Sequence, residues 1–82
     1  MNFDTTRVYG KPNCAQCRMT ERWLDGRGIA YDKVDITESV EDFEAIAALG
    51  YKAAPVVFVA DDVHWSGFQP ALLELHFGND AA

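Results

Sequence analysis

The spacing of apolar and polar positions divides the chain into seven short segments, four with the pattern of strands and three with the pattern of helices. Apolar residues recur at helical spacing in residues 15–26, 39–49 and 70–77, which predicts three helices with one buried face each. Short apolar runs predict strands at residues 5–9, 29–36, 56–59 and 63–65. The third of these runs is apolar on both faces, as expected for a central strand that is covered on both sides.

Each predicted helix has a set of apolar residues that we expect to face the core. These sets are Met19, Trp23 and Leu24 in the first helix, Val40, Phe43, Ile46 and Ala47 in the second, and Leu73 and Phe77 in the third. Phe58 in the central strand is a further expected core residue. Thr37 or Ser39 is expected to cap the second helix, because a hydroxyl oxygen accepts a hydrogen bond from an unpaired N–H of the first turn.

The order of the segments predicts the fold class. A strand, a helix and a second strand in succession imply a parallel pair with a crossover helix, and residues 61–62 form a turn between two antiparallel strands. We therefore expect an α/β protein of order βαβαββα, with a four-stranded mixed sheet and helices on both of its faces. With 82 residues, the chain is expected to form one domain, residues 1–82, and to be a monomer.

Composition narrows the possible partners. The hydrophobic share of 49% suffices for a packed core. The formal net charge of −6 argues against a protein that binds nucleic acid or anionic membranes, because an acidic surface is not drawn to either. Residues 1–7 lack an apolar signal core, and no stretch approaches the roughly 18 apolar residues that a membrane span needs. We therefore expect a cytoplasmic protein, in a compartment that keeps thiols reduced.

The only two cysteines, Cys14 and Cys17, lie where the first strand is followed by the first helix. A cysteine at a helix N-terminus lies among unpaired N–H groups and near the positive end of the helix dipole, and both stabilise a thiolate. Lys11 adds a positive charge, and Pro12 disfavours helix before the pair. Thiols in such sites have pKa values of roughly 3.5–7.5, against about 8.5 for a free cysteine. Cys17 lies one turn later on the same face, less exposed but within reach of Cys14.

This arrangement favours dithiol–disulfide exchange over a zinc site, a permanent structural disulfide and a pair of unreactive buried thiols. In the exchange, Cys14 attacks a substrate disulfide, and Cys17 then attacks the mixed disulfide and releases the reduced substrate. A structural zinc site needs four ligands, and His64 and His76 lack the spacing to complete one with the cysteines. A permanent disulfide is uncommon in a reducing compartment, and buried thiols without reactivity would be small apolar core residues. Neither histidine is expected to be catalytic.

Two further regions are candidates for contact with a substrate. Pro55 immediately precedes the central strand. A cis bond before it would turn the backbone of Ala54 toward an adjacent site and allow it to pair with an extended substrate chain, although most X–Pro bonds are trans. Trp65 and Phe68 flank a Ser-Gly loop, and we expect them to be either lids on the core or part of a docking surface.

With these motifs the sequence resembles the thioredoxin superfamily, and most of all its glutaredoxin-like NrdH-redoxins. The resemblance covers residues 6–75. It rests on Val8-Tyr9, Lys11-Pro12, Cys14-Ala15-Gln16-Cys17, Gly28-Ile29-Ala30-Tyr31, Val34-Asp35-Ile36, Leu49-Gly50-Tyr51, Ala54-Pro55-Val56 and Trp65-Ser66-Gly67-Phe68. The specific part is the C-x-Q-C motif in combination with the W-S-G-F loop.

The resemblance implies a thioredoxin-like fold, with Cys14 as the attacking thiol, Cys17 as the resolving thiol and Pro55 in cis. It implies no bound cofactor: the Cys14–Cys17 disulfide would receive electrons from NADPH through a flavoprotein, thioredoxin reductase. The implied acceptor is the large subunit of class Ib ribonucleotide reductase, to which such redoxins donate electrons. Lys11 and Pro12 are expected to support the site, and the expected docking residues are Ala54, Trp65, Ser66, Gly67 and Phe68.

The sequence departs from its relatives in places that bear on specificity. Typical glutaredoxins hold glutathione with a Gly-Gly-Cys-Asp-like stretch, whereas this region is Ser66-Gly67-Phe68-Gln69 and lacks the acidic residue, so weak glutathione binding is expected. The usual Arg-Pro-Asp of NrdH-redoxins is here Gln69-Pro70-Ala71, and Gly10 stands where Ser or Thr is common.

Two further functions therefore stay open. One is a glutaredoxin that depends on glutathione or another low-molecular-weight thiol and needs only Cys14 for deglutathionylation. The other is a non-catalytic metal-binding module that uses Cys14 and Cys17 as ligands.

Overall fold

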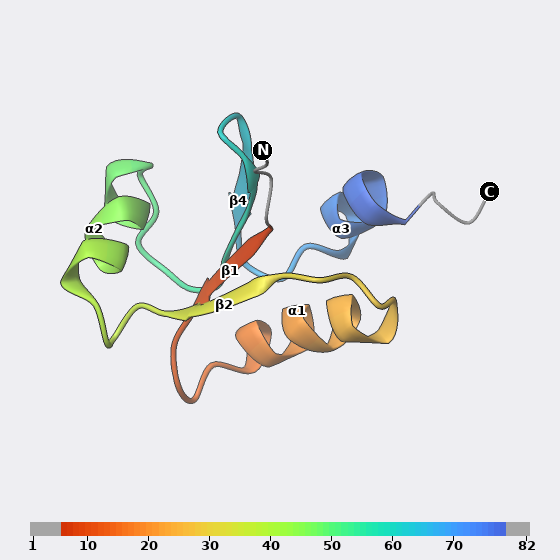
Figure 1. Cartoon of the computed structure of the whole chain (residues 1–82), viewed down its shortest axis with the longest axis horizontal. Coiled ribbons are helices and arrows are strands. Elements are labelled where there is room, and N and C mark those ends of the chain that lie inside the picture. The colour runs from red at the N-terminus through yellow and green to blue at the C-terminus, as the bar shows by residue number, and fades with distance from the viewer. Residues whose placement is uncertain (1–5, 79–82) are drawn as a thin grey trace.

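The computed structural model describes residues 6–78 of the chain (Figure 1). Its elements are β1 (Arg7–Gly10), α1 (Ala15–Gly26), β2 (Asp32–Asp35), α2 (Val40–Ala48), β3 (Val56–Ala60), β4 (Val63–Ser66) and α3 (Pro70–Phe77). The predicted order and the predicted fold class, an α/β protein with a four-stranded mixed sheet, are confirmed. None of the helices within these residues is long and apolar enough to cross a membrane.

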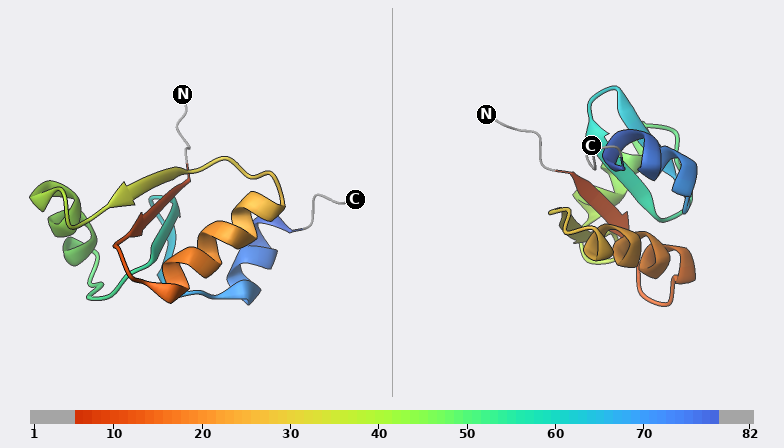
Figure 2. Two further views of the ribbon diagram at one scale, coloured as in Figure 1. Left: turned by 90° about the horizontal axis from the view of Figure 1, so that it is seen from below. Right: turned by 90° about the vertical axis from the view of Figure 1, so that its right-hand side faces the viewer.

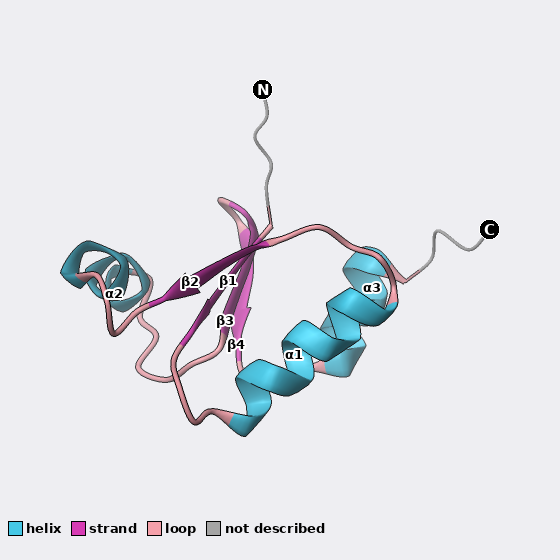
Figure 3. Cartoon of the chain, turned by 60° about the horizontal axis from the view of Figure 1, so that its bottom comes forward, coloured by secondary structure: helices cyan, strands magenta, loops and turns pink. Residues whose placement is uncertain are grey.

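The strand order β2-β1-β3-β4 brings distant parts of the chain to one end of the sheet. β1 runs parallel to β2 and antiparallel to β3, and β3 is antiparallel to β4. Tyr9 therefore pairs with Val56, and Val56 pairs with Ser66. The end of β1, the start of β3 and the end of β4 thus lie side by side, so that the loops attached to them meet (Figure 3).

Two apolar cores lie on opposite faces of the sheet, because alternate residues of a strand point to opposite faces. On one face, α1 and α3 contribute Leu24 and Leu73, which pack with Val8, Val57 and Trp65. On the other face, α2 contributes Ile46, which packs with Tyr9 and Val56. The helices accordingly lie on both sides of the sheet (Figure 2). Three residues that we expected in the core are half-buried and pack against these clusters: Trp23, Phe58 and Phe77.

The buried face of α1 differs from the predicted one. Its buried residues are Cys17, Thr20 and Leu24, whereas Met19 is 45% exposed, so the prediction for Met19 is wrong. The prediction counted only apolar residues, but the central inward position belongs to a threonine. Thr20 is tolerated there because its hydroxyl donates a hydrogen bond to the carbonyl oxygen of Gln16 at 2.9 Å.

The buried face of α2 is also narrower than predicted. Only Ile46 is buried. Val40 and Phe43 are 72% and 53% exposed, and Ala47 is exposed as well, so the predictions for these three residues are wrong. The sheet face beneath α2 is already covered by other half-buried side chains, namely Val34, Ile36, Tyr51 and Phe58. One helix residue is therefore enough to complete this core.

Some element boundaries differ from the predicted ones. The second strand begins at Asp32 rather than at residue 29, because Gly28 adopts a left-handed conformation (φ 70°) and the chain first turns past the end of α1. Of the two candidate caps, Ser39 caps α2, and its Oγ accepts a hydrogen bond from the N–H of Asp42 at 3.2 Å. Residue 5, the expected start of the first strand, lies outside the described residues.

Candidate active site

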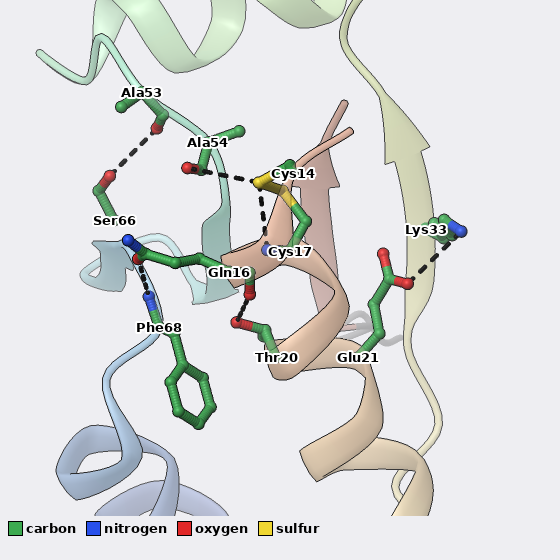
Figure 4. Close-up of a disulfide and its surroundings, with 10 residues drawn as sticks. All are labelled: Cys14, Gln16, Cys17, Thr20, Glu21, Lys33, Ala53, Ala54, Ser66 and Phe68. Atoms are coloured by element: carbon green, nitrogen blue, oxygen red, sulfur yellow. Dashed lines mark hydrogen bonds and ion pairs between the residues drawn. A yellow bond between two sulfur atoms is a disulfide. The ribbon is translucent and has the colours of Figure 1, made fainter. Parts of the chain in front are cut away.

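The two cysteines form a disulfide at the start of α1 (Figure 4). Cys14 is the N-cap residue and Cys17 lies in the first turn, with the two Cα atoms 5.2 Å apart. Cys14 is 8% exposed and Cys17 is 3% exposed. The sequence thus placed the pair correctly, with the first cysteine the more accessible of the two.

Backbone N–H groups of α1 bind both the sulfur and the carbonyl oxygen of Cys14. The N–H of Cys17 donates a hydrogen bond to Sγ of Cys14 at 3.1 Å, and the N–H of Arg18 donates to the carbonyl oxygen of Cys14 at 3.2 Å. The sulfur thus takes the place of the side-chain oxygen that caps most helices. In the reduced protein, the same N–H group and the helix dipole favour the thiolate of Cys14 over the thiol.

The loop before β3 lies against the disulfide. The Ala54–Pro55 bond is cis, the geometry that the resemblance implied. The carbonyl oxygen of Ala54 lies 3.9 Å from Sγ of Cys14. The carbonyl oxygen of Pro55 accepts a hydrogen bond from the N–H of Gly67 at 2.7 Å, which connects this loop to the loop after β4. The backbone of Ala54 therefore lies beside the sulfur of Cys14.

Gln16 links α1 to the loop after β4, a role that its place in the sequence did not reveal. Its Oε1 accepts a hydrogen bond from the N–H of Phe68 at 2.9 Å (Figure 4). The close approach depends on Gly67, which has φ 87° and where a Cβ atom would lie 3.3 Å from Oε1 of Gln16. In the sequence, Gln16 is noticeable only as a polar residue between the two cysteines. Helical spacing alone predicts an exposed residue there, without a specific contact.

The loop after β4 is also held by its own side chains. The hydroxyl of Ser66 donates to the carbonyl oxygen of Ala53 at 3.1 Å. The carboxamide of Gln69 donates from Nε2 to the carbonyl oxygen of Ser66 at 2.8 Å. Gln69 therefore closes the turn that the W-S-G-F motif begins.

The two aromatic residues of this loop have different places. Trp65 is 5% exposed and stacks on His76, so its side chain is a lid on the core and does not form a docking surface. Phe68 is half-buried. It borders an open cavity of about 300 Å³, which is also lined by Met19, Arg22 and Trp23.

A second cavity, of about 290 Å³, opens on the other side of the disulfide. It is lined by the loop that contains Lys11 and Pro12, by the start of α1 and by β2. Both loop residues are exposed. Asn13, the last residue before Cys14, has φ 60°, a conformation that asparagine tolerates better than most residues.

The histidines take part in other contacts. Nδ1 of His64 lies 2.8 Å from the hydroxyl of Tyr51, and its ring stacks on Phe58. His76 stacks on Trp65. Among residues 6–78, no group of three or more histidine, cysteine, aspartate or glutamate side chains is placed to hold a metal ion.

Comparison with known proteins connects this geometry to a family. The family model described as Glutaredoxin matches residues 7–65. The glutaredoxin-like protein NrdH of Lactococcus lactis subsp. lactis is 44% identical over 66 residues, which cover 80% of this chain and 90% of that protein. The glutaredoxin-like protein NrdH of Escherichia coli (strain K12) is 36% identical over 76 residues, which cover 92% of this chain and 93% of that protein.

A solved structure shows the same fold. The NrdH-redoxin of Escherichia coli superposes with a TM-score of 0.78 at 34% sequence identity, over 88% of this chain and 95% of that chain. The description of that structure attributes a thioredoxin-like activity profile to the Escherichia coli protein. The four-stranded sheet and three helices described above are therefore a thioredoxin-like fold.

Proposed function

Because this chain belongs to the glutaredoxin family, as one of its NrdH-like redoxins, we propose that it carries electrons from thioredoxin reductase to disulfides in partner proteins. The chain is a thiol–disulfide oxidoreductase, and its redox group is the Cys14–Cys17 disulfide. The proposal adds the partners: a flavoprotein reductase that draws on NADPH, and class Ib ribonucleotide reductase as the main acceptor. The proposed cycle takes place in the cytoplasm, where thiols are kept reduced.

The observation that carries the proposal is the position of the Cys14 sulfur, which accepts a hydrogen bond from the N–H of Cys17 and lies next to the cis Pro55 loop. In the proposed cycle, the Cys14 thiolate attacks a substrate disulfide. A bond forms between Cys14 and one substrate sulfur, and the other substrate sulfur leaves as a thiolate that takes up a proton. The Cys17 thiolate then attacks Cys14, the protein disulfide forms again, and the substrate leaves with two electrons and two protons.

The loop after β4 supports thioredoxin reductase rather than glutathione as the electron source. Residues 66–69 carry no carboxylate that would bind the amino group of glutathione. The N–H of Phe68, a potential donor to a bound peptide, is already used by Gln16, and the carboxamide of Gln69 is used by Ser66. The activity profile attributed to the related Escherichia coli redoxin is thioredoxin-like, which points in the same direction.

The proposed docking surface for protein partners adjoins Cys14. It consists of the backbone of Ala54, the loop of Ser66, Gly67 and Phe68, and the open apolar cavity next to Phe68. Ala54 is half-buried beside the sulfur, so an extended partner strand can approach Cys14 here, and the cavity can receive one apolar side chain of the partner.

Two parallel assays of NADPH consumption with a protein disulfide substrate test the proposal. One contains thioredoxin reductase, and the other contains glutathione and glutathione reductase. We expect turnover with thioredoxin reductase and little with glutathione, followed by reduction of class Ib ribonucleotide reductase in the same system. Turnover only with glutathione would replace the proposal with a glutathione-dependent glutaredoxin, and no turnover in either assay would overturn both.

Two single-cysteine variants assign the roles within the pair. Cys14→Ser should abolish turnover, because the attacking sulfur is lost. Cys17→Ser should still attack but should accumulate the mixed disulfide with its substrate, which non-reducing electrophoresis detects. Disulfide reductase activity retained by Cys14→Ser would contradict the assigned order of attack.

A further inference from the structure

Tyr51 connects the end of α2 to the edge strand β4. Gly50, with φ 95°, turns the chain out of the helix, and the N–H of Tyr51 donates to the carbonyl oxygen of Ile46 at 3.2 Å. The side chain of Tyr51 is half-buried and reaches β4. Its hydroxyl lies 2.8 Å from Nδ1 of His64 and 3.1 Å from the carbonyl oxygen of the same residue. One hydroxyl group therefore contacts both the side chain and the backbone of His64.

The two contacts of the Tyr51 hydroxyl assign a donor and an acceptor to each bond. A carbonyl oxygen can only accept, so the hydroxyl donates its single proton to the carbonyl oxygen of His64. Nδ1 of His64 then carries a proton and donates it to the hydroxyl oxygen. If the hydroxyl donated to Nδ1 instead, two oxygen atoms 3.1 Å apart would face each other with no proton between them. The His64 ring also stacks on Phe58, with its plane 2° from parallel, so the pair has one defined orientation.

Alternate residues of the loop before β3 are bonded to the end of β4. Tyr51 is the first of them. The carbonyl oxygen of Ala53 accepts from the hydroxyl of Ser66 at 3.1 Å (Figure 4). The carbonyl oxygen of Pro55 accepts from the N–H of Gly67 at 2.7 Å. The loop therefore runs along β4 with every second residue fixed to it.

Ala54 lies between two of these bonded residues, and its carbonyl oxygen lies 3.9 Å from Sγ of Cys14. The helix before the loop cannot fix this position firmly, because Ile46 is the one buried residue of α2. Elements with few buried contacts open locally at low free energy. Tyr51 stands between α2 and Ala54 along the chain, so its bonds to β4 keep movements of the helix from reaching Ala54.

We propose that Tyr51 and His64 are positioning residues that hold the Ala54 backbone in register with an incoming substrate strand, and that they thereby set the affinity for protein disulfides. This inference rests on the proposed function, in which an extended partner strand approaches Cys14 beside Ala54. Main-chain hydrogen bonds supply the affinity when a peptide pairs as an added strand, and these bonds weaken steeply when donor and acceptor are misaligned. A small disulfide forms no such strand and should not depend on the pair.

Single-turnover exchange tests this role without a reductase. The protein is reduced with dithiothreitol, freed of it, and mixed with excess insulin as the protein disulfide or with dithiobis-nitrobenzoate as the small one. Tyr51→Phe should raise the half-saturation concentration for insulin about three- to tenfold, the size of one or two lost hydrogen bonds. The maximal rate with insulin and the rate with the small disulfide should each stay within about twofold of wild type. An unchanged half-saturation concentration, or equal losses with both substrates, would overturn the positioning role.

Matched variants separate the pair from a general effect of losing a hydroxyl. Tyr31→Phe removes a hydroxyl that donates to Oδ1 of Asp25 at 3.1 Å, on the opposite face of the sheet, and should leave the half-saturation concentration unchanged. His64→Asn keeps an N–H donor near the position of Nδ1 and should resemble wild type, whereas His64→Leu should resemble Tyr51→Phe. Combining His64→Leu with Tyr51→Phe should add little, because both remove the same contact. Additive losses would overturn the pair.

NMR provides a readout that does not depend on activity. In the neutral ring of His64, the ¹⁵N shifts should identify Nδ1 as the protonated nitrogen. In oxidised Tyr51→Phe, the amide signals of Ala53 and Ala54 should shift, whereas Tyr31→Phe should leave them in place. Unchanged signals of both alanines in Tyr51→Phe would overturn the positioning role alone. Wild-type protein that reduces no insulin would contradict the proposed function, and this inference with it.

Discussion

At the scale of single residues, the site depends on one contact that periodicity does not reveal. Gln16 is exposed, and yet its Oε1 atom connects the first turn of α1 with the loop that ends at Phe68. The cysteine pair was predictable from its chemistry and spacing, whereas the cis bond before Pro55 followed only from the resemblance to NrdH-redoxins. A glutamine has no such distinctive property, so its role depends on which loop the fold brings to it.

Gln16→Leu removes the acceptor of this hydrogen bond while keeping most of the side-chain volume. We expect a loss of about 0.5–1.5 kcal/mol in the free energy of unfolding, measured by urea denaturation, and a lower kcat/KM with a protein disulfide substrate. Activity on a small disulfide should change less, because it does not need the loop. Gln16→Glu retains an acceptor oxygen and should behave like wild type; an equal loss in both variants would mean that the hydrogen bond to the N–H of Phe68 does not carry the effect.

Tyr31 predicts how stability depends on pH in the alkaline range. Partial burial and a hydrogen bond from its hydroxyl to Oδ1 of Asp25, at 3.1 Å, raise the pKa of Tyr31 to about 12 from 10.0. The folded state thus favours the protonated phenol. Its contribution to stability is complete below pH 10.0 and is lost as the pH rises to about 12. Urea midpoints of Tyr31→Phe should therefore fall less steeply over this range than those of wild type; parallel curves would contradict the assignment.

At the scale of elements, the sequence predicted which segments are helices better than it predicted which faces they bury. Type and order follow from local periodicity and from Gly and Pro positions, and these are properties of a short segment. The orientation of α2 depends on what already covers the sheet beneath it. Because residues from β2, β3 and the loop at Tyr51 fill this face, Val40 and Phe43 stay outside although their spacing is that of an apolar stripe.

A matched pair of substitutions in α2 tests this difference. Ile46 is 2% exposed and Phe43 is 53% exposed. Ile46→Ala should lower the free energy of unfolding by about 2–5 kcal/mol, because it leaves a cavity in the smaller core. Phe43→Ala should change it by about 0.5 kcal/mol or less, since the higher helix propensity of alanine offsets the lost contact. Chemical denaturation of both variants measures these changes. Comparable losses in the free energy of unfolding would mean that Phe43 belongs to the core.

At the scale of the whole molecule, the topology explains why one end of the sheet holds the site. The parallel step from β1 to β2 and the antiparallel return of β3 place the cysteine loop beside Pro55, and the β3–β4 hairpin adds the Ser66–Phe68 loop. The order of elements was predictable from the sequence, and the resemblance to NrdH-redoxins implied a cis Pro55 among the site residues. The close approach of Gly10 to Sγ of Cys17 was not predictable, since it depends on the distance between a backbone and a sulfur rather than on a residue pattern.

The unequal cores predict that the molecule does not open uniformly. α1 has three buried residues, a disulfide and the Gln16 contact, whereas α2 has one buried residue. Elements with few buried contacts open locally at a lower free energy than the whole protein. Amides of α2 should therefore exchange with solvent deuterium at least about tenfold faster than those of α1, a difference of roughly 1.4 kcal/mol in opening free energy.

Hydrogen exchange followed by residue-resolved NMR measures the difference in exchange rate between α1 and α2. A substitution in α2 provides a further test. Ile46→Ala should widen the gap between the helices, because it removes the residue that holds α2 to Tyr9 and Val56. If α2 and α1 exchanged at one rate in wild type, and Ile46→Ala accelerated both equally, the two cores would open as a single unit. Alternate residues of β1 and β3 belong to the two cores. The shared sheet would then transmit the loss of packing around Ile46 on one face to the core on the other face.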